Sequence, residues 1–165
     1  MSSLPVPRFG ERAPDFVLLR PDGSVVRLAD LIGTKTLVLF FYPADETAGC
    51  TIEACAFRDA YLDFVAAGAE VVGVSRDDGD SHRRFASKHA LPFPLLTDPD
   101  GVAHERYGVK RRLGGMLTDR TTFVIDRQGI VRLVFESKLR FAAHTSKALD
   151  LVRALGDGPA AARPS

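Results

Sequence analysis

The stretch formed by residues 36–65 constrains the fold of this chain most, because it joins a strand to a helix through a turn that carries a cysteine. Within it, the apolar run 37–42 has the length and continuity of a strand buried on both faces of a sheet. Pro43 and a short polar turn end this run, and apolar side chains at helical spacing follow from about Cys50. The only other cysteine, Cys55, lies in the same segment. The pattern predicts a reactive thiolate at the start of a helix.

Strands and helices alternate through the middle of the chain, and a hairpin and a last helix follow. This order predicts an α/β sandwich, with a mixed central sheet and helices on both faces. We expect one domain over 1–165, with its core at about 4–155 and a disordered tail at 156–165. The predicted elements are an N-terminal hairpin over 16–28, a helical turn at 28–32, strands 37–42, 70–75, 95–96, 121–126 and 130–136, helices from Cys50 to Gly68 and over 80–89, 102–107 and 143–155, and a loop at 110–119.

Composition excludes several classes of function. The formal net charge of +1 gives no global field that would attract nucleic acid or an anionic membrane. No apolar run approaches the ~20 residues that span a bilayer, and the N-terminus lacks the pattern of a signal peptide. A cytoplasmic location follows by default. In that compartment two close cysteines are more often redox-active or metal-binding than joined in a permanent structural disulfide. The four histidines are scattered without metal-ligand spacing near the cysteines, so we expect no metal site.

Cys50 is placed where a helix favours a charged sulfur. If Thr47 is the N-cap, its hydroxyl can accept from a backbone N–H two or three residues on. Cys50 then occupies the third helical position, where unpaired N–H groups and the positive end of the helix dipole stabilise a thiolate. The alternative is that Cys50 is a small buried apolar residue, as many free cysteines are.

Cys55 lies five residues after Cys50, and this spacing limits what the pair can do. In an intact helix the two Cα atoms are ~8.6 Å apart, whereas a disulfide needs them within ~7 Å. A bond between the two sulfurs therefore requires the first turns of the helix to unwind. The spacing also differs from the C-x-x-C motif of thioredoxin-type oxidoreductases. On this evidence a redox-active thiol and a small core residue are equally good interpretations of Cys55.

The pattern P-x-x-x-T-x-x-C, formed by Pro43, Thr47 and Cys50, resembles the active-site signature of the peroxiredoxins. Cys55 makes the chain similar to the subgroup called bacterioferritin comigratory protein or peroxiredoxin Q. The resemblance covers roughly residues 4–155, and it extends to the segments APDF at 13–16, LLTD at 95–98 and RTTFVID at 120–126. It implies a thioredoxin-like fold, in agreement with the order of the predicted elements.

The resemblance implies a thiol peroxidase that uses no metal or organic cofactor. Cys50 would attack hydrogen peroxide or an organic hydroperoxide and become a sulfenic acid. Thr47 would hydrogen-bond to the peroxide and the thiolate, Pro43 would shield the pocket from water, and Arg120 would be the cation that favours the thiolate. Cys55 would resolve the sulfenic acid as an intramolecular disulfide, and thioredoxin or a similar dithiol reductant would reduce it. We expect a monomer or weak dimer that binds neither nucleic acid nor membrane.

Other interpretations of these residues stay open at this point. Thr47 could be only a helix cap, Pro43 only the end of a strand, and Arg120 only an exposed ion-pair partner. The protein could instead be a disulfide oxidoreductase acting on protein thiols, a one-cysteine peroxidase, or an interaction module whose thiols are incidental. One position departs from the family, which usually has proline where this chain has Ala48, so the first helical turn is expected to unwind more easily.

Overall fold

The structure is a computed structural model that describes residues 7–109, 111–112, 117–118, 120–137 and 140–157. Within these residues, seven strands form one mixed sheet and two short strands pair separately as β6-β7. Strands β5, β4 and β3 run parallel, while β8, β9, β1 and β2 pair antiparallel at the two sides. In sheet order the strands are β2 (Val25–Arg27), β1 (Val17–Leu19), β5 (Leu95–Thr97), β4 (Ala69–Ser75), β3 (Thr36–Phe41), β8 (Thr121–Ile125) and β9 (Val131–Glu136).

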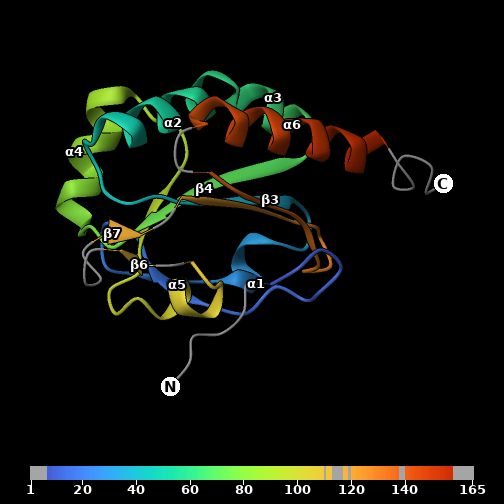
Figure 1. The fold of residues 1–165 in the computed structure, drawn as a ribbon, viewed down its shortest axis with the longest axis horizontal. Helices are drawn as coiled ribbons and strands as arrows, with labels where there is room; N and C mark the ends of the chain where they lie inside the picture. Colours follow the sequence, from blue (N-terminus) through green and yellow to red (C-terminus); the bar gives the residue numbers. More distant parts are fainter. Residues whose placement is uncertain (1–6, 110, 113–116, 119, 138–139, 158–165) are drawn as a thin grey trace.

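Helices cover both faces of this sheet (Figure 1). One face carries α2 (Ala48–Asp59), α3 (Tyr61–Ala66), α4 (Gly79–His89) and α6 (Phe141–Asp157), and the other carries α1 (Leu28–Leu31) and α5 (Val102–Arg106). The predicted α/β sandwich, its mixed sheet and its N-terminal hairpin are therefore confirmed. No helix in the described ranges is both long and apolar enough to cross a bilayer.

Strand β3 is the centre of the sheet because its side chains supply the cores on both faces. All six of its residues are buried, and successive side chains point to opposite faces of a strand. Leu39 belongs to the core under α1 and α5. Phe40 belongs to the core under α2, α3, α4 and α6, where its ring stacks on Phe57 with centroids 4.5 Å apart. The uninterrupted apolar run in the sequence is thus explained by burial on two sides.

The structure corrects several boundaries. The helix predicted from Cys50 to Gly68 is two helices, which meet at Ala60, where the backbone leaves helical geometry (φ −97°, ψ 2°). No proline or glycine marks this break. Val65, one of the apolar side chains at helical spacing in this segment, lies on the second helix and is 47% exposed.

The predicted loop at 110–119 contains β6 (Arg111–Arg112) and β7 (Leu117–Thr118), and its other residues lie outside the described ones. The last helix, α6, continues through 156–157, so the disordered tail predicted over 156–165 is wrong for these two residues. The remaining tail, 158–165, and residues 1–6 lie outside the described residues, so a single domain over 1–165 stays a prediction.

Candidate active site

The register of two neighbouring strands explains why Arg120 lies beside the cysteine turn. Strand β8 pairs antiparallel with β3, and Phe41, the last residue of β3, lies opposite Thr121, the first of β8. Arg120 precedes β8 directly, so it lies next to the turn that follows β3. Residues separated by 70 positions in the sequence are thereby brought together by backbone pairing.

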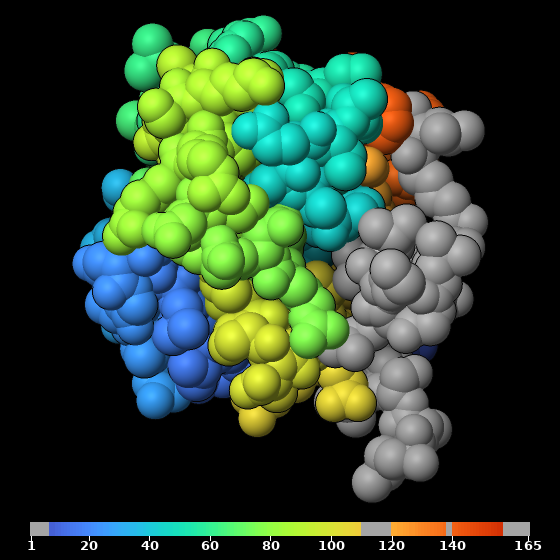
Figure 2. Space-filling view, turned by 90° about the vertical axis from the view of Figure 1, so that its left-hand side faces the viewer, coloured from blue at the N-terminus to red at the C-terminus, as the bar shows by residue number. Residues whose placement is uncertain are grey.

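Cys50 is the third residue of α2, as predicted, and its side chain is buried with 1% exposure. The Nη1 of Arg120 lies 3.4 Å from the Cys50 Sγ, at the hydrogen-bond distance for sulfur. Arg120 as a whole is 7% exposed, so little water screens its charge from the sulfur. Burial of Cys50 agrees with a small apolar core residue as well as with a reactive thiolate. The buried cation in contact with its sulfur favours the thiolate. The turn and the start of α2 reach the surface beside the segment around α4 (Figure 2).

Thr47 occupies the N-cap position but does not cap the helix with its side chain, and this corrects the prediction. Its backbone is extended (φ −79°, ψ 153°) and its hydroxyl donates to the Ala44 carbonyl oxygen at 3.0 Å. Glu46, at φ 65°, folds the turn so that this carbonyl comes within reach. The first-turn N–H groups near Cys50 are consequently left for another acceptor. Pro43, half-buried, lies in the same turn.

A buried hydrogen-bond network that sequence reasoning missed holds this turn against α4. Asp45 accepts from the Tyr42 hydroxyl at 2.6 Å and from Ser81 at 2.8 Å, and its Oδ2 lies 2.7 Å from His82 Nδ1. Burial alone would raise the pKa of Asp45, but the hydrogen bonds from His82 and Tyr42 hold it below its ordinary value. The sequence around Asp45 gave no signal, because two of its partners, Ser81 and His82, come from the distant helix α4.

A second missed group lies one helical turn after Cys50. Glu53 has 0% exposure, and its Oε1 accepts from Arg120 Nη1 at 2.8 Å. Its Oε2 lies 3.4 Å from His144 Nδ1. Burial raises the pKa of Glu53 to about 7, although Arg120 opposes the rise. Spacing i, i+3 places Cys50 and Glu53 on one helix face, and a charged residue on an apolar face was the signal available.

Gly49 leaves room for the cation above the helix start. A Cβ at this position would lie 2.7 Å from Phe141 Cζ and 3.1 Å from Arg120 Nη2. The Arg120 guanidinium carbon lies 4.8 Å from the centre of the Phe141 ring, which adds a cation–π contact. The glycine before Cys50 thus permits α6, α2 and Arg120 to meet at one point.

Cys55 lies further along α2 and is half-buried, and the thiols of both Cys50 and Cys55 are free. Both cysteines belong to one uninterrupted helix. The structure therefore brings Cys50 and Arg120 together, with Thr47 and Pro43 in the adjoining turn, while Cys55 belongs to the same helix without a disulfide.

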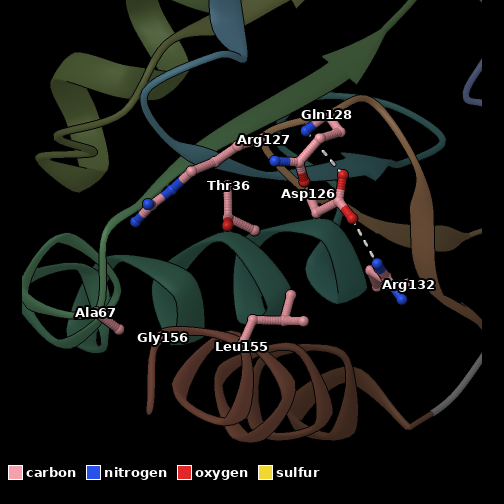
Figure 3. A pocket seen from close by; sticks show the side chains of 8 residues that line it. All are labelled: Thr36, Ala67, Asp126, Arg127, Gln128, Arg132, Leu155 and Gly156. Atoms are coloured by element: carbon pink, nitrogen blue, oxygen red, sulfur yellow. Dashed lines mark hydrogen bonds and ion pairs between the residues drawn. The ribbon is translucent and has the colours of Figure 1, made fainter. Parts of the chain in front are cut away.

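No cluster of three His, Cys, Asp or Glu side chains in the described ranges could hold a metal ion. A surface pocket of about 310 Å³ lies at the other end of β3 from Cys50 (Figure 3). None of the five predicted site residues lines it. Its lining is Thr36, Ala67, Asp126, Arg127, Gln128, Arg132, Leu155 and Gly156.

The family model and the known proteins that match this chain agree with one another. Residues 9–134 match the model of the AhpC/TSA family. The chain is 44% identical to the chloroplastic peroxiredoxin Q of Populus jackii over 146 residues, which are 88% of this chain and 68% of that protein. It is 46% identical to the chloroplastic peroxiredoxin Q of Arabidopsis thaliana over 145 residues, which are 88% of this chain and 67% of that protein.

Solved structures agree with the sequence relatives. The crystal structure of peroxidoxin BcpB from Mycobacterium tuberculosis superposes with a TM-score of 0.85 at 41% identity, covering 90% of this chain and 98% of that one. A structure of the Xanthomonas campestris bacterioferritin comigratory protein, described for its alkyl peroxide reduction activity, gives a TM-score of 0.77 at 31% identity, covering 86% and 92%. These likenesses confirm the thioredoxin-like fold.

The expected cytoplasmic location is contradicted by these relatives. The plant proteins carry chloroplastic names, which point to a plastid rather than to the cytoplasm. The expectation rested on the lack of a recognisable leader. A targeting sequence is a segment that takes no part in the folded domain, so the residues of the domain do not reveal the compartment.

Proposed function

Because this chain belongs to the AhpC/TSA family and is a peroxidase of the peroxiredoxin Q group, we propose that it reduces hydrogen peroxide and organic hydroperoxides through Cys50. The observation that carries the proposal is the buried Arg120 guanidinium, 3.4 Å from a sulfur in the first turn of a helix. Helix dipole and cation together favour the thiolate, which is the nucleophilic form of cysteine.

In the first step the Cys50 thiolate attacks the terminal oxygen of the peroxide. The S–O bond forms as the O–O bond breaks, so the sulfur is oxidised to a sulfenic acid and the peroxide leaves as an alcohol or water after taking up a proton. Arg120 stabilises the negative charge that develops on the oxygens. Thr47 orients the peroxide through its hydroxyl, and Pro43 limits the access of water to the pocket.

In the second step Cys55 resolves the sulfenic acid. Its thiol attacks the Cys50 sulfur, a disulfide forms and water leaves. The intact helix keeps the thiols too far apart, so its first turns must unwind. Three features support easy unwinding: Ala48 stands at the first helical position, Thr47 makes no side-chain cap, and Ile52 is 52% exposed. A cap is worth about 1 kcal/mol to a helix.

In the third step a thioredoxin-like dithiol reduces the disulfide and returns both thiols, after which α2 refolds. We propose that the protein does this as a monomer or weak dimer, and sedimentation at micromolar concentrations tests that state.

The decisive experiment is peroxide consumption coupled to thioredoxin and its reductase. We expect turnover in the wild-type protein and none in Cys50→Ser, because the nucleophile is gone. A Cys50→Ser protein that keeps full activity would exclude the mechanism. Reduction of insulin without peroxide turnover would instead favour a disulfide oxidoreductase.

The role of Cys55 is tested separately. After a stoichiometric peroxide pulse, mass spectrometry should find a disulfide between Cys50 and Cys55 and the loss of two hydrogens. Cys55→Ser should accumulate the sulfenic acid and stop turning over with thioredoxin. Normal turnover of this variant would replace the resolving role with a one-cysteine mechanism.

A further inference from the structure

Glu53 is a carboxyl group that the chemistry above does not use, although it shares a cation with the reactive sulfur. Its side chain has 0% exposure. Oε1 accepts from Arg120 Nη1 at 2.8 Å, and the same nitrogen lies 3.4 Å from Cys50 Sγ. Among the described residues Oε2 has no hydrogen-bond partner. An ionised carboxylate with one bare oxygen is costly at full burial, so the protonation state of Glu53 has to be settled.

The ring of His144, on the far side of Glu53 from Arg120, shows which atoms carry protons. Its Nε2 lies 3.0 Å from the Ser137 carbonyl oxygen, so Nε2 carries a hydrogen. Burial, aided by Arg120, lowers the pKa of His144 to about 4, so the ring is neutral at pH 7 and Nδ1 presents a lone pair. The Thr122 hydroxyl lies 2.7 Å from that nitrogen and donates to its lone pair.

Glu53 Oε2 therefore faces a nitrogen that has no hydrogen to donate to it. Glu53 Oε2 and His144 Nδ1 are 3.4 Å apart, and because the neutral ring offers no N–H on this side, nothing there stabilises a carboxylate and burial favours the protonated acid. The other face of Glu53 meets the single positive charge of Arg120. The groups that face this buried cluster are thus Cys50 from α2, Arg120 from the residue before β8, Thr122 from β8, and His144 from α6.

Charge counting gives the same answer. A thiolate and a carboxylate together place two negative charges against one guanidinium, in a space that little water reaches. Because acids that share a site titrate as a coupled pair, one of them keeps its proton to higher pH.

We propose, on the basis of the proposed peroxidase function, that Glu53 is a positioning residue that keeps its proton, so that the charge of Arg120 is left to the Cys50 thiolate and the peroxide. Ionisation of Glu53 at higher pH divides that charge between two anions and weakens the hold of Arg120 on the sulfur. The pKa of Glu53, which burial raises to about 7, agrees with this order of titration.

The test measures the thiolate directly and needs no peroxide. In a Cys55→Ser background, so that one sulfur reports, the ultraviolet absorbance of the Cys50 thiolate is followed against pH. Glu53→Gln keeps the shape and an uncharged side chain, which is the state proposed for Glu53 while Cys50 ionises, so the pH of half-ionisation should change by less than about 0.3 unit, whereas removal of an ionised neighbour would lower it by about one unit or more. Asp59→Asn removes a carboxylate from the exposed part of the same helix and should change nothing.

A second readout uses the wild-type protein alone. Infrared spectra of the reduced protein at pH 6 should contain the carbonyl band of a buried, protonated carboxyl group, and this band should fade as pH rises through 7 or 8. A pH of half-ionisation that falls by about one unit in Glu53→Gln but not in Asp59→Asn, or no such band, would overturn the proposal. Failure of the peroxidase assay would overturn the proposed function instead and leave both readouts intact.

Discussion

Replacing Glu53 by Gln and His144 by Asn should tilt the pH dependence of folding stability in opposite directions. Burial raises the pKa of Glu53 from 4.5 to about 7. Between these values the folded state holds a proton that the unfolded chain releases. The stability that this group contributes is therefore complete below pH 4.5 and is lost as pH rises through 7.

His144 acts with the opposite sign. Burial lowers its pKa from 6.5 to about 4, so the unfolded chain holds a proton that the folded state lacks. The contribution of His144 is present above pH 6.5 and is lost as pH falls through 4. Between pH 4.5 and 6.5 the pair carries one proton in both states, on the imidazole when unfolded and on the carboxyl when folded, so its two slopes cancel.

The magnitude follows from about 1.4 kcal/mol per pH unit for each proton. In Glu53→Gln the histidine acts unopposed, and the free energy of unfolding should fall by roughly 3 kcal/mol from pH 6.5 to 4. In His144→Asn the carboxyl acts unopposed, and the free energy should fall by a similar amount from pH 4.5 to 7.

The assay is urea denaturation at half-unit steps of pH. All proteins carry Cys50→Ser, so that no thiolate competes for Arg120, and the protein with both Glu53 and His144 intact is the reference. Differences from this reference remove the titration of all other groups. Slopes of the same sign in the two variants, or two flat lines, would refute the exchange of one proton between carboxyl and imidazole.

Three further predictions concern the start of α2. Arg120→Lys should slow oxidation of Cys50 by about 10²-fold in stopped flow, because an ammonium does not reproduce the guanidinium fork; a loss below about threefold would contradict its role. Gly49→Ala should slow the same step about tenfold, a cost of ~1.4 kcal/mol, because its Cβ would lie 2.7 Å from Phe141 Cζ, and adding Phe141→Leu should restore the rate if the clash is the cause. Ala48→Pro should leave the peroxide rate within about twofold but slow disulfide formation in quenched mass spectrometry, because proline stiffens the first turn; a large change in the peroxide rate would show that this turn takes part in the chemistry.

Residues that act through their neighbours along the chain were predictable from the sequence. The position of Cys50 in the first turn follows from helical spacing alone, and the structure places it at the third residue of α2. Thr47 shows where such reasoning ends. It stands at the N-cap as predicted, but its hydroxyl turns back to the Ala44 carbonyl, because the conformation of the preceding turn decides which partner is within reach.

The resemblance to a family pointed to Arg120, but local pattern did not place it beside the sulfur. Glu53 and His144 escaped both approaches. An acidic residue in an amphipathic helix and a histidine in another are ordinary in sequence. They become unusual only when α2 and α6 pack on the same face of the sheet and exclude water from both.

The sequence by itself determined the order of the elements, the buried central strand and the helix start that carries Cys50, because each depends on contacts between residues near in the chain or on a simple alternation of apolar side chains. Only the tertiary structure decided which charges surround the sulfur. Arg120 arrives through the pairing of β8 with β3. Glu53 contacts Arg120 from α2, and His144 contacts Glu53 because α6 packs against α2. A pKa depends on burial and on charges a few ångströms away, and neither quantity exists until the chain has folded.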